Sequence, residues 1–185
     1  DFVKGFIPNS LFIGLNGTFA MWVGALIEDI NQKIVLIVPE GKEEEAVTRL
    51  SRVGYDNTVG YLDGGIAAFV NAGGQLNTIT SISPEELENI HKDANIVDVR
   101  KPGEFDSEHI MDATHYALDY MNDDLNKLEK GTPHYVHCAG GYRSVIAISL
   151  LMQNGYTNLI NIEKGFAGIK NTGISCTGYV CPTTL

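Results

Sequence analysis

Residues 135–144 read Tyr-Val-His-Cys-Ala-Gly-Gly-Tyr-Arg-Ser, and a long apolar run continues from there to Asn154. The short apolar segment Tyr135–His137 predicts a buried strand, and Ser144–Asn154 predicts a helix. Between them lie two adjacent glycines, which let the backbone curl so that its N–H groups converge on one point. We therefore predict a strand–loop–helix unit of an α/β protein with Cys138 at the end of the strand.

Cys138 is the candidate nucleophile of this loop. A thiol before a helix start is close to the free N–H groups and the positive end of the helix dipole. Both effects, together with the charge of Arg143, favour the thiolate and lower a thiol pKa from its ordinary value of about 8.5. A buried structural cysteine is the commoner fate of an isolated thiol. The coincidence of Gly140, Gly141, Arg143 and the helix start favours the functional interpretation.

The chain also repeats itself at an offset of about 100 residues, too long a period for a solenoid. Val53–Asn57 (Val-Gly-Tyr-Asp-Asn) matches Asn154–Asn158, and Tyr61–Ala67 matches Asn161–Ala167. The repeat predicts two α/β domains, residues 1–76 and 77–185, separated within the uncharged, turn-rich segment Gly74–Ser83. Each domain is expected to contain a parallel sheet with helices on both faces. In the second domain the expected elements are helix 84–92 and strands Ile96–Val99 and Leu159–Ile162.

The first repeat lacks the features that give the second its chemistry. It has no counterpart of Asn95–Arg100 and begins at Asp1-Phe2, which matches Glu104-Phe105, so we expect its amino end to be truncated. Its strand Ile34–Val38 is followed by the acidic segment Pro39–Glu45 and contains no cysteine. An acidic helix start repels anions. The first domain is therefore expected to be catalytically inactive, with a packing or docking role.

The uncharged segment Gly5–Ile27 is long enough to suggest a membrane span. Its proline, asparagines and glycines break a single apolar helix, and we expect a strand at Leu11–Ile13 and a helix at Thr18–Ile30 instead, with no membrane partner.

The composition of the chain argues against two further classes of protein, those that bind nucleic acids and those built on disulfides. It has 185 residues, 13 Lys+Arg against 23 Asp+Glu, and a formal charge of -10, which argues against a nucleic-acid partner. Three cysteines are too few for a disulfide framework and indicate a reducing, cytoplasmic compartment.

Several motifs of the second domain together resemble the rhodanese family. They are Asp98-Val-Arg100, Glu104-Phe105, His109-Ile110, Cys138–Ser144 and Ile162-Glu-Lys-Gly165. The resemblance implies two tandem rhodanese-like domains. It also implies sulfur chemistry, because the six-residue loop Cys138–Arg143 has the length found in sulfurtransferases, whereas phosphatases and arsenate reductases of the same fold have one residue more.

The resemblance implies a sulfurtransferase mechanism without cofactor or metal. Cys138 would take the outer sulfur of an anionic donor, such as thiosulfate or glutathione persulfide, and pass it to a thiol, sulfite or cyanide. Arg143 and the loop would bind the donor, and Arg100 is expected to pair with Glu104. The expected donor-binding residues are Ala139, Gly140, Gly141, Tyr142, Arg143 and Ser144, and the supporting residues are Asp98, Arg100, Glu104 and His137.

Two segments of the first repeat suggest a more specific relationship. Gly5-Phe-Ile-Pro8 and Leu15–Gly24 resemble the rhodanese portion of metallo-β-lactamase-fold/rhodanese fusions, which combine a persulfide dioxygenase with a sulfurtransferase. The resemblance implies an upstream, iron-dependent domain as a partner and a place in a larger sulfide-oxidation protein. The metal motifs of such a domain do not occur in this chain.

Two other functions stay open at this point. One is a non-catalytic docking or sulfide-sensing tandem module, and the other is an anion-reducing or phosphatase enzyme on the same fold. Cys176 and Cys181 have three interpretations: a terminal disulfide, a sulfur relay from Cys138, or inert thiols. His134, His137 and Cys138 are close in sequence, but residues three apart on a strand point to opposite faces, so we expect no metal site.

Overall fold

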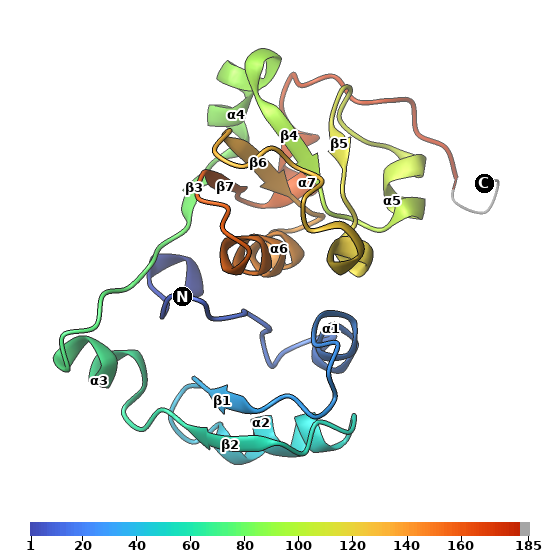
Figure 1. Cartoon of the computed structure of the whole chain (residues 1–185). Helices are drawn as coiled ribbons and strands as arrows, with labels where there is room; N and C mark the ends of the chain where they lie inside the picture. Colours follow the sequence, from blue (N-terminus) through green and yellow to red (C-terminus); the bar gives the residue numbers. More distant parts are fainter. Residues whose placement is uncertain (182–185) are drawn as a thin grey trace. The chain divides into compact units, whose positions relative to one another are not determined.

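The computed structural model describes residues 1–181. The chain divides into two compact units, which are described separately (Figure 1): an amino-terminal unit, Gly5–Asn77, and a carboxyl-terminal unit formed by Asp1–Lys4 and the chain from Thr78 onward. The predicted second domain runs to residue 185, so its last four residues lie outside the described part. The division differs from the predicted one at residues 1–4, because the Val3 carbonyl accepts a hydrogen bond from the Ile79 N–H at 2.9 Å. It also differs at Asn77, whose N–H bonds to the Phe6 carbonyl at 2.9 Å and which belongs to the amino-terminal unit.

The carboxyl-terminal unit is built on a five-stranded sheet with the order β3-β7-β6-β4-β5. Every neighbouring pair is parallel, as the alternation of apolar runs and helices predicts. The three strands expected from the sequence in this unit are confirmed to within about one residue, the usual uncertainty of strand ends. The strands are β3 (Thr80–Ile82), β4 (Asn95–Asp98), β5 (Thr114–His115), β6 (His134–His137) and β7 (Leu159–Ile162).

Helices cover both faces of this sheet (Figure 1). Helix α6 (Tyr142–Gln153) lies against one face, and its residues from Ser144 to Leu151 are all buried. Helices α4 (Pro84–Ile90) and α7 (Gly165–Ile169) contribute Leu87, Phe166 and Ile169 to a core cluster shared with β4 and β7. Helix α5 (Pro102–Ser107) follows β4, and three short 3-10 segments are η1 (Phe2–Lys4), η2 (His91–Asp93) and η3 (Leu118–Asp124).

Strand β3 was not expected, because it lies inside the segment interpreted as a linker. Thr80 and Ile82 pair with Ile160 and Ile162 of β7 at the edge of the sheet. An edge strand pairs with a neighbouring strand on one side only and tolerates polar residues such as Thr80 and Ser81. Its sequence pattern therefore resembles that of a turn-rich linker.

Helix α4 begins with a capping box. The Glu86 N–H donates to the Ser83 hydroxyl at 3.1 Å, and the Ser83 N–H donates to the Glu86 carboxylate at 2.8 Å. These bonds satisfy two N–H groups that a helix start otherwise leaves free.

Replacing Ser83 by alanine is expected to lower the free energy of unfolding by about 1 kcal/mol, because the Glu86 N–H loses its acceptor. Urea denaturation followed by circular dichroism measures the change. Ser175→Ala, at an exposed serine of the same unit, is the control and should change stability by less than about 0.5 kcal/mol. Equal stabilities of the two variants would contradict the role of the cap.

The amino-terminal unit has a two-stranded parallel sheet of β1 (Ile34–Leu36) and β2 (Thr58–Tyr61). Its helices are α1 (Phe19–Leu26), α2 (Glu43–Ser51) and α3 (Gly65–Asn71). A core cluster joins α1 to α2 through Phe19, Val23 and Leu50. The unit is therefore α/β like the other, but its described sheet has fewer strands.

The expectations for the start of this unit are confirmed in part. The helix is present as α1 but ends at Leu26, where Ile27 becomes extended. The strand expected at Leu11–Ile13 is wrong. These residues lie in a short stretch between a turn at Pro8-Asn9 and a bend that begins at Leu15. Ile13 packs onto the core of the unit without joining a sheet. Among residues 1–181, no helix combines the length and apolarity that crossing a membrane requires.

Candidate functional site

The loop after β6 has the backbone that its glycines predict. Strand β6 ends at His137, Cys138 follows directly, and α6 begins at Tyr142 with Gly141 as its cap. Gly141 has φ of 100°, a conformation that residues with a side chain rarely adopt. Helix α6 starts two residues earlier than expected, so Tyr142 and Arg143 belong to its first turn.

The sulfur of Cys138 lies beside the first turn of α6. The Gly141 N–H donates a hydrogen bond to Sγ at 3.1 Å, and the thiol donates to the Ser144 hydroxyl at 3.7 Å. The Ser144 hydroxyl in turn donates to Oδ1 of Asn161 at 2.7 Å, and Cys138 as a whole is only 1% exposed. An N–H directed at the sulfur and the positive end of a helix of twelve residues both stabilise negative charge on it.

Helix α7 supports the loop from the other side. The N–H groups of Phe166 and Ala167 donate to the carbonyls of Cys138 and Ala139 at 2.7 and 3.0 Å. The helix approaches this closely because it begins with Gly165, where an added Cβ would lie 2.3 Å from the Cys138 carbonyl oxygen. Gly165 is not among the site residues predicted from the sequence, although its place in the family motif Ile162-Glu-Lys-Gly165, three residues after the end of β7, marks it.

Arg143 is held in a two-pronged ion pair with Glu104. Its Nη1 and Nη2 atoms lie 2.5 and 2.8 Å from the two carboxylate oxygens. The hydrogen bonds from Arg143 lower the pKa of Glu104, and the same contacts raise the pKa of Arg143. The predicted pairing of Glu104 with Arg100 is therefore wrong, since Glu104 binds the arginine of the loop itself.

Arg100 pairs with Asp98 instead. Arg100 is 4% exposed and Asp98 is fully buried; Nη2 lies 2.6 Å from Oδ2, and a further bond reaches the Glu108 carbonyl at 2.7 Å. The Arg100 side chain, which precedes α5, folds back onto β4 and lies 4.0 Å above the ring of Phe166. Burial raises the pKa of Asp98, but the His137 ring and the Arg100 guanidinium outweigh it and lower the pKa.

His137 lies beneath the loop and is completely buried. Its Nδ1 is 3.3 Å from the Cys138 carbonyl, its Nε2 is 3.8 Å from Oδ2 of Asp98, and its ring stacks on Phe166. Burial lowers the pKa of His137 despite the nearby carboxylate, which favours the neutral ring. The structure therefore brings Asp98, Arg100 and His137 together under Cys138.

The other two cysteines, Cys176 and Cys181, lie in the segment that follows α7. Cys176 is half-buried and Cys181 exposed, and no disulfide joins them, so the terminal-disulfide interpretation is wrong. Burial raises the pKa of Cys176, which favours its unreactive thiol form. Within residues 1–181, no three potential metal ligands cluster.

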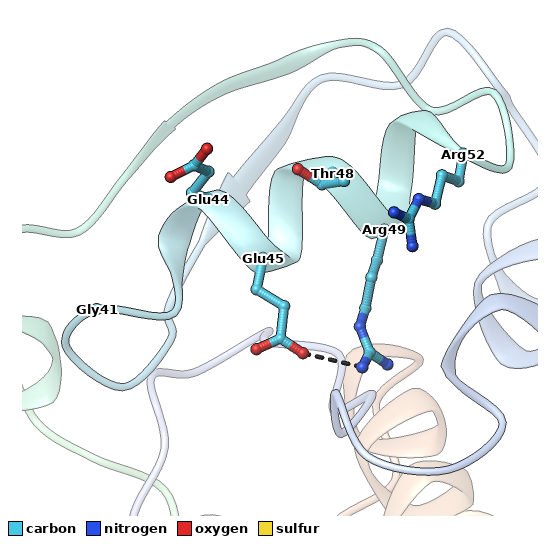
Figure 2. A pocket seen from close by; sticks show the side chains of 6 residues that line it. All are labelled: Gly41, Glu44, Glu45, Thr48, Arg49 and Arg52. Carbon is cyan, nitrogen blue, oxygen red and sulfur yellow. Dashed lines mark ion pairs between the residues drawn. The ribbon is translucent and has the colours of Figure 1, made fainter.

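The corresponding helix of the amino-terminal unit has a different environment. Helix α2 starts with Glu43, Glu44 and Glu45, and Arg49 is paired with Glu45 at 2.9 Å. A shallow hollow of about 450 Å³ lies along this helix (Figure 2), lined by Gly41 and residues between Glu44 and Arg52. No cysteine occurs in this half of the sequence, so the hollow offers no sulfur nucleophile.

Several known proteins are similar in sequence to about half of this chain. Bacillus subtilis YqhL is 32% identical over 92 residues, covering 50% of this chain and 73% of that protein. Thiosulfate sulfurtransferase GlpE of Pseudomonas syringae is 30% identical over 86 residues, covering 46% and 81%. A rhodanese-like domain protein from Staphylococcus aureus, of known crystal structure, is 32% identical with a TM-score of 0.48, covering 52% and 97%.

The family profile described as "Rhodanese-like domain" matches the chain in two regions, residues 1–72 and 83–172. The second region contains Cys138, its loop and the buried cluster beneath it. Together the regions span most of the sequence, and the chain thus belongs to the rhodanese family as a tandem pair of rhodanese-like domains.

Proposed function

We propose that the protein is a sulfurtransferase that carries sulfane sulfur as a persulfide on Cys138. The observation that supports this most directly is the Gly141 N–H directed at Sγ at 3.1 Å, at the start of α6. The two glycines of the short loop Cys138–Arg143 allow its backbone to curl toward the sulfur. The names of the GlpE relatives point to the same chemistry.

The first half-reaction loads the cysteine. The Cys138 thiol loses its proton to solvent, and the thiolate attacks the outer sulfur of thiosulfate. A new S–S bond forms at Sγ, the S–S bond of thiosulfate breaks, and sulfite leaves with the electron pair. The N–H of Gly141 and the dipole of α6 stabilise the negative charge that persists on the cysteine side.

The second half-reaction unloads it. A thiolate, sulfite or cyanide attacks the outer sulfur of the Cys138 persulfide, the Sγ–S bond breaks, and Cys138 returns as a thiolate. A low-molecular-weight persulfide such as glutathione persulfide serves as donor by the same exchange. The chemistry needs no cofactor, because both steps are nucleophilic displacements at sulfur.

We assign the amino-terminal unit a docking role, on the ground that it lacks a cysteine and begins α2 with three glutamates. The segments Gly5–Pro8 and Leu15–Gly24 remain the basis for proposing a partner domain that oxidises persulfides, within a larger cytoplasmic sulfide-oxidation protein.

Thiocyanate formation from thiosulfate and cyanide tests the function. The proposal expects turnover that saturates with thiosulfate and no hydrolysis of an aryl phosphate. Absence of thiocyanate together with an unmodified Cys138 would favour a non-catalytic docking module. Aryl phosphate hydrolysis would favour the phosphatase interpretation.

Replacing Glu104 by glutamine is expected to lower the KM for thiosulfate about threefold at low salt, because the Arg143 guanidinium loses its neutralising partner beside the loop. The effect should shrink as salt is added. Because Arg143 lowers the pKa of Glu104, the ion pair is intact above the ordinary glutamate pKa and is lost as pH falls through the lowered value. An unchanged KM and salt dependence would show that Arg143 has no influence on the donor.

A further inference from the structure

Strand β1 of the amino-terminal unit has a partner on one side only. Its neighbour is β2, and within residues 1–181 no other strand joins their sheet. The Ile34 N–H donates to the Asn57 carbonyl at 2.9 Å, so the peptide groups of Ile34 are directed to the β2 side. Successive residues of a strand direct their N–H and C=O groups to opposite sides. The peptide groups of Val35 and Ile37 therefore face the open edge of β1.

The carboxyl-terminal unit shows what occupies the corresponding edge. In the internal repeat β1 and β2 match β6 and β7, about 100 residues further along the chain. Strand β6 pairs in parallel with β7 on one side and with β4 on the other. The His137 carbonyl, the counterpart of the Ile37 carbonyl, accepts a hydrogen bond from the Val99 N–H at 3.0 Å. Among the described residues, the amino-terminal unit has no counterpart of β4, so the position beside β1 is open.

The two strands also expose apolar side chains. Val35 is 63% exposed, Val59 59% and Tyr61 53%. In a parallel sheet such side chains are ordinarily covered by helices or by further strands. Helix α3 follows β2 as α7 follows β7, but α3 buries none of its residues, whereas α7 buries Phe166 and Ile169. An open strand edge beside exposed apolar residues is the arrangement to which an extended segment adds.

The charges at the two ends of β1 favour a particular kind of segment. Lys33 directly precedes β1, Glu40 follows four residues after its end, and both are exposed. A parallel strand begins near Lys33 and ends near Glu40, so an acidic residue before it and a basic residue after it are complementary. Strand β4 has this pattern, with Asp93 shortly before it and Arg100 shortly after it.

We propose that β1 accepts a parallel strand from a partner protein, and that this strand is an apolar, β-branched segment with an acidic residue before it and a basic residue after it. This rests on the docking role proposed for the amino-terminal unit and names its surface and its partner. The peptide groups of Val35 and Ile37 exchange hydrogen bonds with the added strand. A second copy of this chain does not fit, because two copies related by a two-fold axis pair their strand edges antiparallel.

The probe is a synthetic peptide with the sequence of residues 93–101 that carries Asp98→Val. In the carboxyl-terminal unit Asp98 lies opposite His137, whereas the counterpart of His137 in β1 is the apolar Ile37, so valine suits this position. Amide hydrogen exchange of the whole chain is followed by NMR. Saturating peptide is expected to slow exchange of the Val35 and Ile37 N–H groups about tenfold or more. A peptide with the same residues in scrambled order is the control and should change neither rate.

Variants of the edge test the same contact by titration calorimetry. Val35→Pro removes the N–H that faces the open edge and is expected to raise the Kd of the peptide about tenfold or more. Val35→Lys keeps the N–H but places a charge at the edge, and is expected to raise the Kd about fivefold, which keeps the test usable if the proline variant unfolds. Val47→Lys, at an exposed valine of α2, is the matched control and should leave the Kd within about twofold of wild type.

Unchanged exchange rates, or an equal Kd in the Val35 and Val47 variants, would overturn the proposal. Slow exchange at Val35 without peptide would also overturn it: protection that grows with protein concentration would show pairing between copies, and protection at every concentration would show that the edge is already covered. Thiocyanate formation should stay within about twofold of wild type in all these variants. Its absence in the wild-type protein would overturn the proposed sulfurtransferase function instead, so the two failures are distinguishable.

Discussion

Replacing Cys138 by serine is expected to reduce sulfur transfer from thiosulfate to cyanide by about 10³-fold or more, down to the background of the assay. A hydroxyl cannot take the outer sulfur of the donor, and no other cysteine lies in the loop. The Gly141 N–H and the Ser144 hydroxyl still have an oxygen to bond with. The fold should therefore persist, and a thiocyanate assay beside a thermal melt separates lost chemistry from lost structure.

Cys176→Ser and Cys181→Ser are the matched controls for this variant. Neither cysteine is in a disulfide and both lie outside the loop, so each variant should keep transfer within about twofold of wild type. Transfer that persists in Cys138→Ser but fails in Cys176→Ser or Cys181→Ser would contradict the assignment of the nucleophile.

Replacing Gly165 by alanine is expected to lower the free energy of unfolding by about 3 kcal/mol or more, the combined effect of an unfavourable backbone and an overpacked contact. Gly165 has φ of 52°, and its added Cβ would lie 2.3 Å from the Cys138 carbonyl oxygen and 2.9 Å from backbone atoms of Ala139. Because those atoms belong to the loop, α7 must move away or the loop must shift. Sulfur transfer should fall about tenfold or more in protein that remains folded.

Gly103→Ala is the control for the glycine substitution. Gly103 lies in α5, where an added Cβ meets nothing within 4 Å, and alanine favours a helix. Urea denaturation should show Gly103→Ala as stable as wild type or more so, and Gly165→Ala clearly destabilised. If Gly165→Ala kept wild-type stability and activity, the close packing of α7 on the loop would have no functional importance.

The centre of the site could be predicted from sequence because its determinants are local. A strand, a cysteine, two glycines and a helix start follow one another between Tyr135 and Ser144, so backbone rules place the sulfur near the N–H groups of α6. The hydrogen bond from Gly141 to Sγ is the result. The buried hydrogen bond from the Ser144 hydroxyl to Asn161 joins residues 17 apart, so no local sequence pattern predicts it.

The ion pairs could not be predicted, because side-chain direction decides them. The resemblance to the rhodanese family implies that Arg100 pairs with Glu104, four residues further along the chain. Arg100, however, lies just before α5 and turns back to Asp98, while Glu104 lies inside the helix and reaches Arg143, 39 residues away. Because Arg100 lies before α5 and Glu104 lies inside it, their side chains point to different partners, which the sequence does not reveal.

The segments that complete the unit also had weak patterns. β3 is a short edge strand with polar residues, and residues 175–180 form only scattered backbone hydrogen bonds to residues 107–111. Neither has the periodicity that marks a buried element. Long-range contacts alone position them: β3 pairs with β7, and the chain after α7 bonds to the end of α5 and the residues that follow it.

The most direct test of the account is the intact mass of the wild-type protein after incubation with thiosulfate, followed by peptide mapping. The account predicts a gain of one sulfur atom, located on the peptide that contains Cys138 and removed by cyanide. An unchanged mass, or a sulfur located on Cys176 or Cys181 instead, would contradict it.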